Sequence, residues 1–442
     1  MIKKFWKLKS NHDRVNAKNQ LRKYRKKSQK KKRKNSVDYY DNKFKEDYKY
    51  FINYNLLKTS NISNNIYMLS CPEIFSLKQN YNSSMEFISH VSSLASKTIY
   101  SNVNLIYINL KKCKVYDLDA SCVLDSVMIK LMPLLKKHNV DFKVDFPGNK
   151  ESLAFKNIIT TGFVNENGWT TRKIPTKKIR EKLKETTGIK FVDFNKNNIE
   201  NYDIITTEIV EMIFSNFTNK EKYINSMGKI ISEVVDNVRE HSENKSWYIV
   251  GNVIPKDEHN KSSIRLAIFN YGNTIAYNLK RFMNSPSILL PSKQEKIVNV
   301  SKEIVRKHRP LFKPDYYEEE QAYTFLAMQQ GISSKIIDDN NINKRGSGIY
   351  KLMKEIYKIS DLYDREWSNL SIISGNTMIK FKNKYKYSKN NEIDEQLYQI
   401  NFNDKNSIFY SQDRDCIEKL KYNIPGTIIY LDFKFKEELI NE

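Results

Sequence analysis

The feature that most constrains the fold is a helical run that begins near Lys222 and contains the segment Glu233 to His241. Glu233, Asn237 and His241 recur every four residues, which places them on one stripe of a helix. A second face, about a third of a turn away, is apolar and consists of Ile224, Met227, Ile231, Val234, Val235 and Val238. Such a helix can pack through one face while its carboxylate, amide and imidazole groups meet a ligand.

The spacing of Glu233 and Asn237 suits nucleotide chemistry. An amide oxygen can ligate Mg²⁺, and a carboxylate one turn away can orient a water molecule or a hydroxyl group. The alternative is a solvated polar face, because this spacing also arises by chance. The helix alone leaves both interpretations open.

Two later segments extend the pattern. A strand-like run, Ser263 to Asn270, leads into Tyr271-Gly272-Asn273. Much later, Lys344-Arg345-Gly346-Ser347-Gly348 opens a helix that continues to Tyr357. Glycines at a helix start let the backbone approach phosphates, and the free N–H groups there attract anions. The alternative for this glycine pair is a simple helix-start turn.

The C-terminal part predicts three further strands. Leu370 to Ile373 and Thr377 to Phe381 flank Ser374-Gly375-Asn376, and this pattern predicts a hairpin. A last strand is expected from Gly426 to Phe433.

In this order the segments resemble the GHKL ATP-binding fold, which histidine kinases, anti-sigma-factor serine kinases, DNA gyrase and MutL mismatch-repair proteins share. The resemblance covers residues 203–435 and rests on the ordered set of segments more than on any one of them. It implies an α/β (α+β) architecture, a GHKL α/β sandwich, with ATP and Mg²⁺ as ligands.

The resemblance assigns roles residue by residue. Glu233 is the general base of the members that hydrolyse ATP, and Asn237 is the Mg²⁺ ligand. Asn270 stands where the family usually has an aspartate that contacts the adenine amino group; Gly272 follows as in the family, but the second glycine of that motif is missing. Since an amide oxygen accepts this hydrogen bond without charge assistance, we expect weaker adenine affinity.

The resemblance also implies a phosphate-binding segment and a lid. The phosphate-binding residues are Lys344, Arg345, Gly346, Ser347 and Gly348. The lid spans about residues 273–345, with helical patches at Gln294 to His308 and Glu318 to Gln330. Gly331 is either a lid hinge or an ordinary helix C-cap.

The N-terminal half predicts a βαβα unit, with strands at 102–110 and 140–146 and helices from Leu118 and Glu151. Asp119 or Ser121 is expected to cap the first helix, and Pro133 to kink or restart it.

Residues 65–165 of this unit resemble a STAS domain, the fold of anti-anti-sigma factors. The resemblance makes Ser121 the candidate phosphoacceptor, although Cys122 replaces the glycine of the family motif. The alternative is a plain N-cap serine in a scaffold without a phosphorylation site.

Charge is concentrated at the N-terminus. Residues 1–36 contain sixteen Lys and Arg against the single acid Asp13, a formal charge of +15 out of the chain's +24. Such a block is typical of a disordered tail that neutralises phosphates on nucleic acid or on an anionic membrane. A merely solubilising tail is the alternative.

We therefore expect a basic tail at 1–60, a STAS-like domain at 61–165, a basic connector at 166–200 and a GHKL domain at 201–442 with an insertion at about 384–424. The sequence contains neither an apolar run of about eighteen residues nor a signal-peptide core, which predicts a cytoplasmic protein. The four cysteines show no metal-binding or disulfide pattern.

Three functional classes follow. The first is a regulatory ATPase or serine kinase that acts on its own STAS-like domain or on a protein partner. The second is a non-catalytic scaffold that senses ATP, and the third is a nucleic-acid-associated ATPase recruited by the tail. The sequence names no partner protein, and a homodimer stays open.

Overall fold

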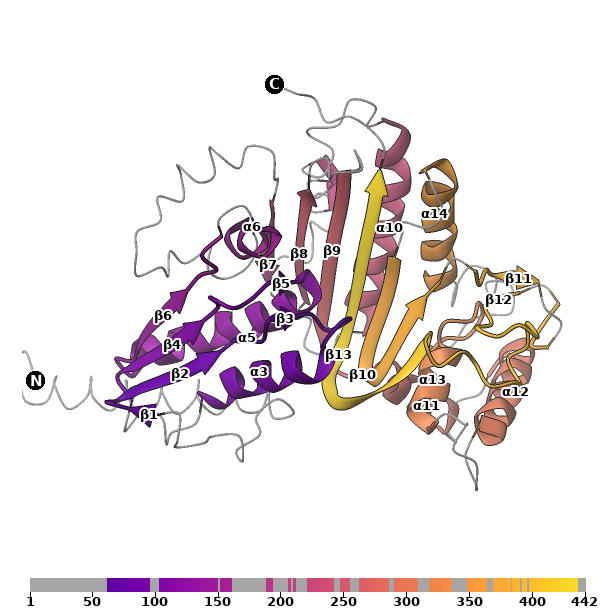
Figure 1. The fold of residues 1–442 in the computed structure, drawn as a ribbon. Coiled ribbons are helices and arrows are strands. Elements are labelled where there is room, and N and C mark those ends of the chain that lie inside the picture. Colours follow the sequence, from indigo (N-terminus) through magenta and orange to yellow (C-terminus); the bar gives the residue numbers. More distant parts are fainter. Residues whose placement is uncertain are drawn as a thin grey trace, which may run out of the picture.

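The fold is a mixed α+β arrangement of two larger sheets, two small ones and their helices (Figure 1). A computed structural model describes residues 62–95, 103–149, 152–160, 188–193, 206–207, 210–211, 221–241, 247–254, 262–285, 290–308, 318–335, 348–363, 369–382, 384–389, 392–395 and 397–435. The basic tail and most of the predicted connector lie outside these residues.

The N-terminal unit is built on a four-stranded sheet. Its strands, in spatial order, are β1 (Ile62–Ser63), β2 (Ile66–Ser70), β4 (Leu105–Asn109) and β6 (Asp141–Asp145). β2, β4 and β6 run parallel, and β1 pairs antiparallel with β2. A separate parallel pair joins two short strands, β3 (Ile74–Phe75) and β5 (Val115–Tyr116).

Helices α3 (Tyr81–Ser93), α5 (Leu118–Lys137) and α6 (Leu153–Thr160) belong to the same unit. The predicted order of strand, helix, strand and helix is present as β4, α5, β6 and α6. Of the two alternatives predicted for Pro133, a restart of the helix is wrong, since α5 continues through that residue as one helix, and a kink stays a prediction. Buried leucines on both sides of Pro133, Leu131 and Leu134, hold the helix against the core.

The predicted cap of α5 is also wrong. The N-cap residue is Asp117, whose side chain makes no capping hydrogen bond. The Asp119 carboxylate instead accepts hydrogen bonds from the backbone N–H groups of Leu77 (3.2 Å) and Lys78 (2.9 Å). Asp119 therefore ties α5 to the loop before α3.

The second sheet has five strands, and all neighbouring strands pair antiparallel. In spatial order they are β10 (Asn369–Phe381), β13 (Ile417–Phe435), β9 (Ser262–Tyr271), β8 (Trp247–Ile254) and β7 (Gly188–Asp193). This sheet carries the strand that the sequence predicted at Ser263 to Asn270, and its C-terminal strand is longer than predicted.

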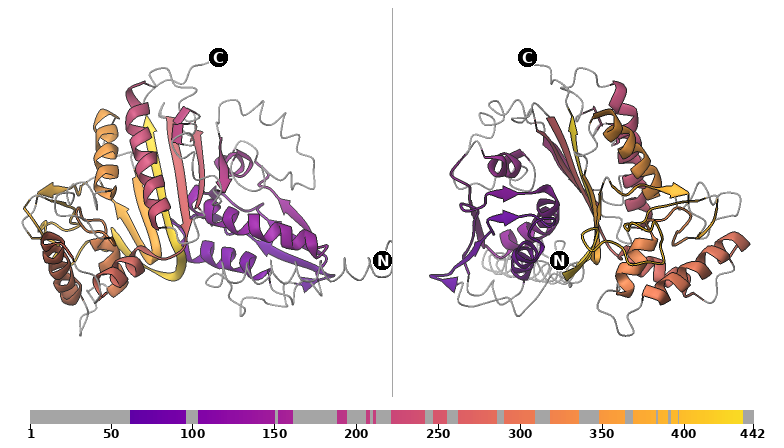
Figure 2. Two further views of the ribbon diagram at one scale, coloured as in Figure 1. Left: turned by 180° about the vertical axis from the view of Figure 1, so that it is seen from behind. Right: turned by 45° about the vertical axis from the view of Figure 1, so that its right-hand side comes forward.

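Two long helices, α10 (Glu221–His241) and α14 (Gly348–Tyr363), lie side by side on one face of this sheet (Figures 1 and 2). Three further helices gather near one end of it: α11 (Ile275–Met283), α12 (Ser292–His308) and α13 (Glu319–Leu326). The helical patch predicted from Gln294 is present as α12, whereas α13 ends four residues before the predicted end.

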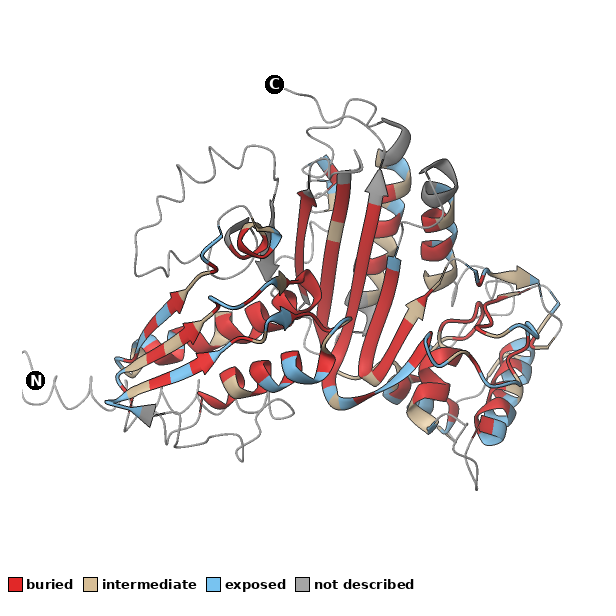
Figure 3. Ribbon diagram, in the orientation of Figure 1, coloured by how far each residue is buried: buried red, intermediate tan, exposed pale blue. Residues whose placement is uncertain are grey.

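The N-terminal unit covers the other face of the five-stranded sheet, with α5 and α3 as the contacting layer (Figure 2). Alternation along β9 divides its side chains accordingly: Leu266 and Ile268 pack with α10 and α14, while Ala267 and Phe269 pack with the N-terminal unit. Both faces of the sheet are therefore buried (Figure 3).

The hairpin predicted at Ser374-Gly375-Asn376 is wrong. Residues 369–381 form one strand, β10, that pairs along β13, with register shifts on both sides of Gly375. Gly375 has a φ of +60°, and a Cβ there would overlap the Glu320 carboxylate of α13. The glycine thus permits a bulge and close approach of α13, not a chain reversal.

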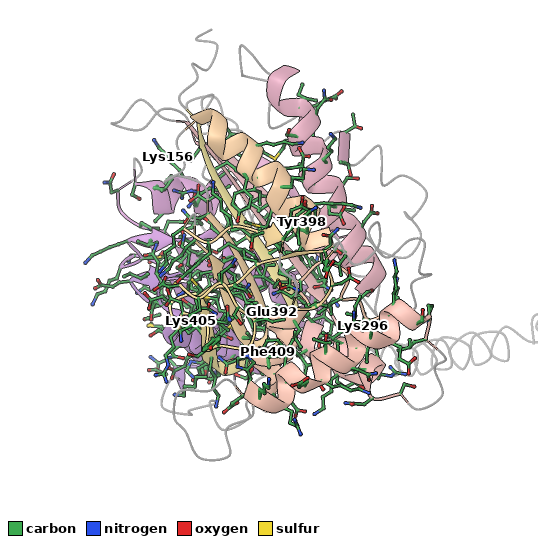
Figure 4. The ribbon with its side chains drawn as sticks, turned by 90° about the vertical axis from the view of Figure 1, so that its right-hand side faces the viewer. Lys156, Lys296, Glu392, Tyr398, Lys405 and Phe409 are labelled. Atoms are coloured by element: carbon green, nitrogen blue, oxygen red, sulfur yellow. The ribbon has the colours of Figure 1, made fainter. Side chains whose placement is uncertain are left out.

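The predicted insertion is an irregular segment containing one small antiparallel pair, β11 (Ser388–Lys389) with β12 (Tyr398–Gln399). It ends earlier than expected, because β13 begins at Ile417. Figure 4 shows Glu392, Tyr398, Lys405 and Phe409 of this segment spread over one side of the molecule, with Lys296 of α12 nearby. The segment packs beside α12, α13 and the start of α14.

Candidate functional site

Helix α10 fixes the two polar residues predicted to carry the chemistry. Its apolar face is fully packed, with Met227, Ile231 and Val234 at most 1% exposed. Glu233 and Asn237 stand beside that face and stay partly accessible. Their helix is therefore anchored in the core, while the carboxylate and the amide are not covered by it.

The start of α14 lies against these two side chains. A Cβ placed on Gly348, the first residue of α14, would lie 2.7 Å from Glu233 Oε1, 2.8 Å from Asn237 Nδ2 and 2.9 Å from Asn237 Oδ1. Only glycine allows this approach without moving the polar groups. The structure thus brings together three predicted residues, although more than a hundred positions separate Asn237 from Gly348.

The amide of Asn237 has a defined orientation. Its Nδ2 donates a 2.8 Å hydrogen bond to the backbone oxygen of Glu233. This bond uses one N–H of the amide, and both Nδ2 and Oδ1 lie close to the start of α14. An amide held in this way can offer its oxygen to a cation.

Glu233 has a cationic neighbour that the sequence argument missed. The ammonium Nζ of Lys351 lies 3.9 Å from Glu233 Oε2, and both side chains are partly exposed. Lys351 is one turn into α14, three residues after Gly348. Because residues at this spacing lie on the same face of a helix, the sequence could have predicted that Lys351 lies near Glu233. Its charge adds to the electropositive start of the helix.

Asn270 occupies the end of β9, on the sheet face that carries α10 and α14. Its position follows from alternation with Leu266 and Ile268, which face the same helices. Across the strands it pairs with Trp247, the first residue of β8. Because α10 ends at His241, shortly before Trp247, the end of α10 lies near the same end of the sheet.

The side chain of Asn270 is buried without satisfying its oxygen. The residue is 2% exposed, and among the described residues Oδ1 has no hydrogen-bond partner. A buried acceptor in this state is unfavourable unless a ligand or water binds it.

Two hydroxyl residues continue the row from Asn270 across the sheet. Thr427 of β13 pairs with Asn270, and Ser374 of β10 pairs with Thr427. Their hydroxyl oxygens are 2.9 Å apart, and Ser374 Oγ also accepts the backbone N–H of Ile275 at 2.9 Å. Neither hydroxyl was predicted, although Thr427 lies in the predicted last strand.

Two glycines, Gly272 and Gly426, allow the end of β9 and the neighbouring part of β13 to approach each other closely beside this row. Gly272 donates its N–H to Pro425 O at 3.3 Å, with a φ of +152°. Gly426 has a φ of +130°, and a Cβ there would overlap the backbone oxygen of Asn270. Gly272 thus takes part in a tight contact between β9 and β13, and its role in nucleotide binding stays a prediction.

The rest of the predicted phosphate-binding segment lies outside the described residues: Lys344, Arg345, Gly346 and Ser347. The side chain of His241 is outside them as well. Of that segment, only Gly348 can be placed.

The segment before the phosphate-binding residues is braced by the insertion. The backbone N–H of Tyr398 donates to Gln330 Oε1 at 2.9 Å, and Tyr387 OH donates to Met328 O at 2.5 Å. Gly331 has a φ of +84° and abuts Leu397. Since α13 ends at Leu326, Gly331 does not directly cap that helix.

The same insertion reaches α14. The ring of Tyr350 stacks on Tyr398 with centroids 5.0 Å apart and meets Tyr387 edge-on at 5.2 Å. Tyr350 is two residues after Gly348 in the first turn of α14. The aromatic cluster therefore fixes where that helix begins relative to the insertion.

The residues present are compatible with a nucleotide and Mg²⁺. Within the described ranges, no three His, Cys, Asp or Glu side chains converge on a metal position. A cation at Asn237 would therefore take one amide oxygen from the protein and its other ligands from phosphates and water, the mode usual for Mg²⁺.

Ser121 lies far from these groups along the fold and is buried. It is 0% exposed, and its hydroxyl donates to Asp125 Oδ2 at 3.2 Å. Its helix, α5, packs on the opposite face of the five-stranded sheet from α10 and α14. A kinase would have to open α5 to reach this hydroxyl.

No family model matches the sequence, and neither the curated proteins nor the solved structures contain a match. Among the described helices, none combines the length and the apolar character needed to cross a bilayer.

Proposed function

We propose that the chain is a regulatory ATP-binding protein of the GHKL type, in which an ATP and Mg²⁺ site controls the attached N-terminal unit. The observation that carries the proposal is the meeting of Glu233, Asn237 and Gly348 at the start of α14. The sequence predicted them from two separate motifs, Glu233 and Asn237 from one and Gly348 from another more than a hundred residues later.

Each residue has a role in the proposal. Asn237 presents Oδ1 to Mg²⁺, and Gly348 lets the phosphates approach the free N–H groups of α14. Glu233 orients the attacking water and takes its proton, and Lys351 sits where it can exchange the carboxylate for a phosphate. ATP, when bound, supplies the phosphoanhydride, and the buried Asn270 recognises the base.

In this proposal, nucleotide binding affects the N-terminal unit through the five-stranded sheet. The N-terminal unit resembles a STAS domain in its parallel β2, β4 and β6, with α3 and α5 between them in the chain. It packs on the strands whose other face carries α10 and α14, so Ile268 of β9 and its neighbours Ala267 and Phe269 pack in cores on opposite faces of the sheet. A shift of β9 on nucleotide binding would therefore move the contact with α5.

The burial of Ser121 favours an ATPase over a kinase that modifies its own N-terminal unit. A kinase acting on a separate protein stays within the proposal. Mass spectrometry of phosphopeptides after incubation with ATP distinguishes these, with Ser121 as the first peptide to inspect.

A second candidate is a sensor that binds ATP without hydrolysis, and the observation that favours it is Asn270. Without charge on this residue, we expect lower affinity for adenine than a carboxylate would give. The sensor would respond to nucleotide concentration through binding alone.

The experiment compares the full-length parent with Glu233→Ala in nucleotide binding and in release of phosphate. For an ATPase, the variant should bind ATP as the parent does but release phosphate about 100-fold more slowly, as expected for loss of a general base. Lys302→Ala, an exposed position on α12, serves as the control. Binding without any phosphate release by the parent would select the sensor instead.

A further inference from the structure

The four-stranded sheet of the N-terminal unit has an outer face that the described helices leave accessible. Helices α3 and α5 pack on its inner face, between this sheet and the five-stranded one (Figure 2). Helix α6 lies against β5, where Asn157 Nδ2 donates to Tyr116 O at 2.7 Å. A parallel sheet is usually buried on both faces, because helices cover each side of it. The outer face of β2, β4 and β6 is therefore a place where a further element is expected to pack.

The outer face is apolar on two of its strands. Along β2, residues that point into the core alternate with Ile66 and Met68, which point away from it. The parallel register sets Leu105 of β4 beside Ile66 and Tyr107 beside Met68. Met68 is 51% exposed, and the other three are half-buried. These four side chains form the outer patch, and β6 adds charged side chains along one side of it.

The chain enters this sheet beside the outer patch. Ile62, at the start of the described part of the chain, pairs with Tyr67, the neighbour of Met68. Its strand, β1, lies at the edge of the sheet. The residues that come just before Ile62 therefore begin next to the most exposed member of the patch, and a segment ending there needs no long connection to reach it.

The sequence of that segment, residues 37–60, differs from the basic block before it. It carries four acids and four lysines, a formal charge of zero, and contains neither glycine nor proline. Tyr40, Phe44, Tyr48 and Phe51 recur at intervals of four, four and three residues, which predicts four aromatic rings on one stripe of a helix. A helix over residues 40–57 would be about 27 Å long. It is thus long enough to cross the patch, since a five-residue strand spans roughly 17 Å.

Another long stretch that adjoins this unit is less suited to the patch. Residues 161–187, which follow α6, are interrupted by Gly162, Gly168 and Pro175. They also carry seven Lys and Arg against three acids. Glycine and proline at these positions break a continuous apolar stripe.

We propose that residues 40–57 form an amphipathic helix that docks on the outer patch and completes the N-terminal unit with a layer outside its sheet. The aromatic stripe covers Met68 and Tyr107, and the charged side chains of the segment stay in solvent. The docked segment fixes where the basic block of residues 1–36 leaves the molecule, on the side away from α10 and α14. Docking involves neither nucleotide nor metal, so its test does not depend on the proposed ATP site.

The test is hydrogen–deuterium exchange of the full-length protein, measured by mass spectrometry in peptides from residues 40–57. In the parent, amides of these peptides should exchange at least about tenfold more slowly than in an unstructured chain. Met68→Lys places a charge in the outer patch, so it should remove this protection while peptides of α5 stay protected. Tyr277→Lys is the matched control, because Tyr277 has nearly the same exposure (52%) but lies on α11, and it should leave the protection unchanged.

A reciprocal test changes the segment and follows the patch. Oxidation of the Met68 thioether to the sulfoxide by dilute hydrogen peroxide depends on its access to solvent. The double variant Phe44→Asp/Phe51→Asp should make Met68 oxidise several times faster than in the parent, because the docked rings no longer cover it. Lys49→Asp, on the opposite side of the predicted helix, should leave the oxidation rate unchanged.

The second test decides the matter if Met68→Lys prevents folding, since its variants change only the segment that precedes β1. Parent peptides from residues 40–57 that exchange as an unstructured chain overturn the proposal. Equal oxidation of Met68 in the parent and in Phe44→Asp/Phe51→Asp overturns it as well. Protection of Met68 that appears only as the protein concentration rises would assign the patch to a second copy of the chain and also overturn it.

Discussion

At the residue scale, Asp119 shows how the fold shifts the pKa of a carboxylic acid. It is 1% exposed, and burial followed by the nearby charge of Asp117 raises its pKa to about 7, against the lowering effect of three backbone N–H groups. Its carboxylate joins the first turn of α5 to Leu77 and Lys78. The interface between α5 and its neighbours therefore contains a group that titrates near neutral pH.

Because this pKa is higher in the folded state than in the unfolded chain, the folded protein holds a proton that the unfolded one has lost. The contribution of Asp119 to the free energy of unfolding should thus fall as pH rises from about 4 to about 7, by at most about 1.4 kcal/mol per pH unit, and stay level above. Urea unfolding of the parent and of Asp119→Asn at several pH values measures this. A stability difference that is independent of pH between 5 and 7 would contradict it.

At the scale of elements, Gly348 is important for the packing of two helices, because it lets the start of α14 lie close to α10. Gly348→Ala should push the Cβ against Glu233 and Asn237 and weaken nucleotide binding about tenfold or more, since misplacement of such groups by 1 Å is costly. The measurement is the affinity for ATP with Mg²⁺.

Gly228→Ala is the matched control for that substitution. Gly228 lies within α10, and a Cβ there would meet nothing within 4 Å. The alanine should leave nucleotide affinity unchanged and stabilise the protein by up to about 1 kcal/mol through helix propensity. Equal losses of affinity in the two variants would mean that Gly348 has no special place in the site.

Elements with a strong local pattern were predictable. The amphipathic spacing of α10 gave both its buried face and the position of Glu233 and Asn237, and the glycine at 348 gave the start of α14. The proximity of Glu233, Asn237 and Gly348 could therefore be anticipated from motifs, whereas their role in nucleotide binding stays a prediction.

The errors arose where distant residues decide the structure. Ser374-Gly375-Asn376 has the composition of a turn, but β13 pairs with both sides of it and Glu320 fills the space at the glycine, so a bulge results. The burial of Ser121 depends on α5 packing against the five-stranded sheet. The row of Ser374, Thr427 and Asn270 depends on strand order, which local spacing does not encode.

On the scale of the whole molecule, the N-terminal unit and the helices α10 and α14 pack on opposite faces of the same five-stranded sheet. Cys122 of α5 donates through its thiol to Ala267 O of β9 at 3.7 Å, and Tyr81 OH of α3 donates to Tyr422 O of β13 at 2.6 Å. Asn252 Nδ2 of β8 donates to Asn157 Oδ1 of α6 at 2.6 Å. The N-terminal unit is thus joined directly to the strands of this sheet, as the proposed output from a nucleotide site would require.

The basic tail remains a prediction, since residues 1–36 lie outside the described part of the chain. With a charge of +15, it should bind duplex DNA, RNA or anionic vesicles weakly and without sequence preference, with a log–log salt slope of about −0.9 per phosphate contact on DNA. A chain lacking residues 1–36 should lose this binding and keep its affinity for ATP. Undiminished binding to DNA would place the basic surface on the remaining +9 body.

The central claim is tested most directly by the affinity for ATP of the full-length parent and of Asn237→Ala, each measured by calorimetry with Mg²⁺ and with a chelator. The parent should bind more tightly with Mg²⁺. Asn237→Ala should lose that gain, because it removes the amide oxygen that faces Gly348. A variant whose affinity rises with Mg²⁺ as much as the parent's would contradict the account.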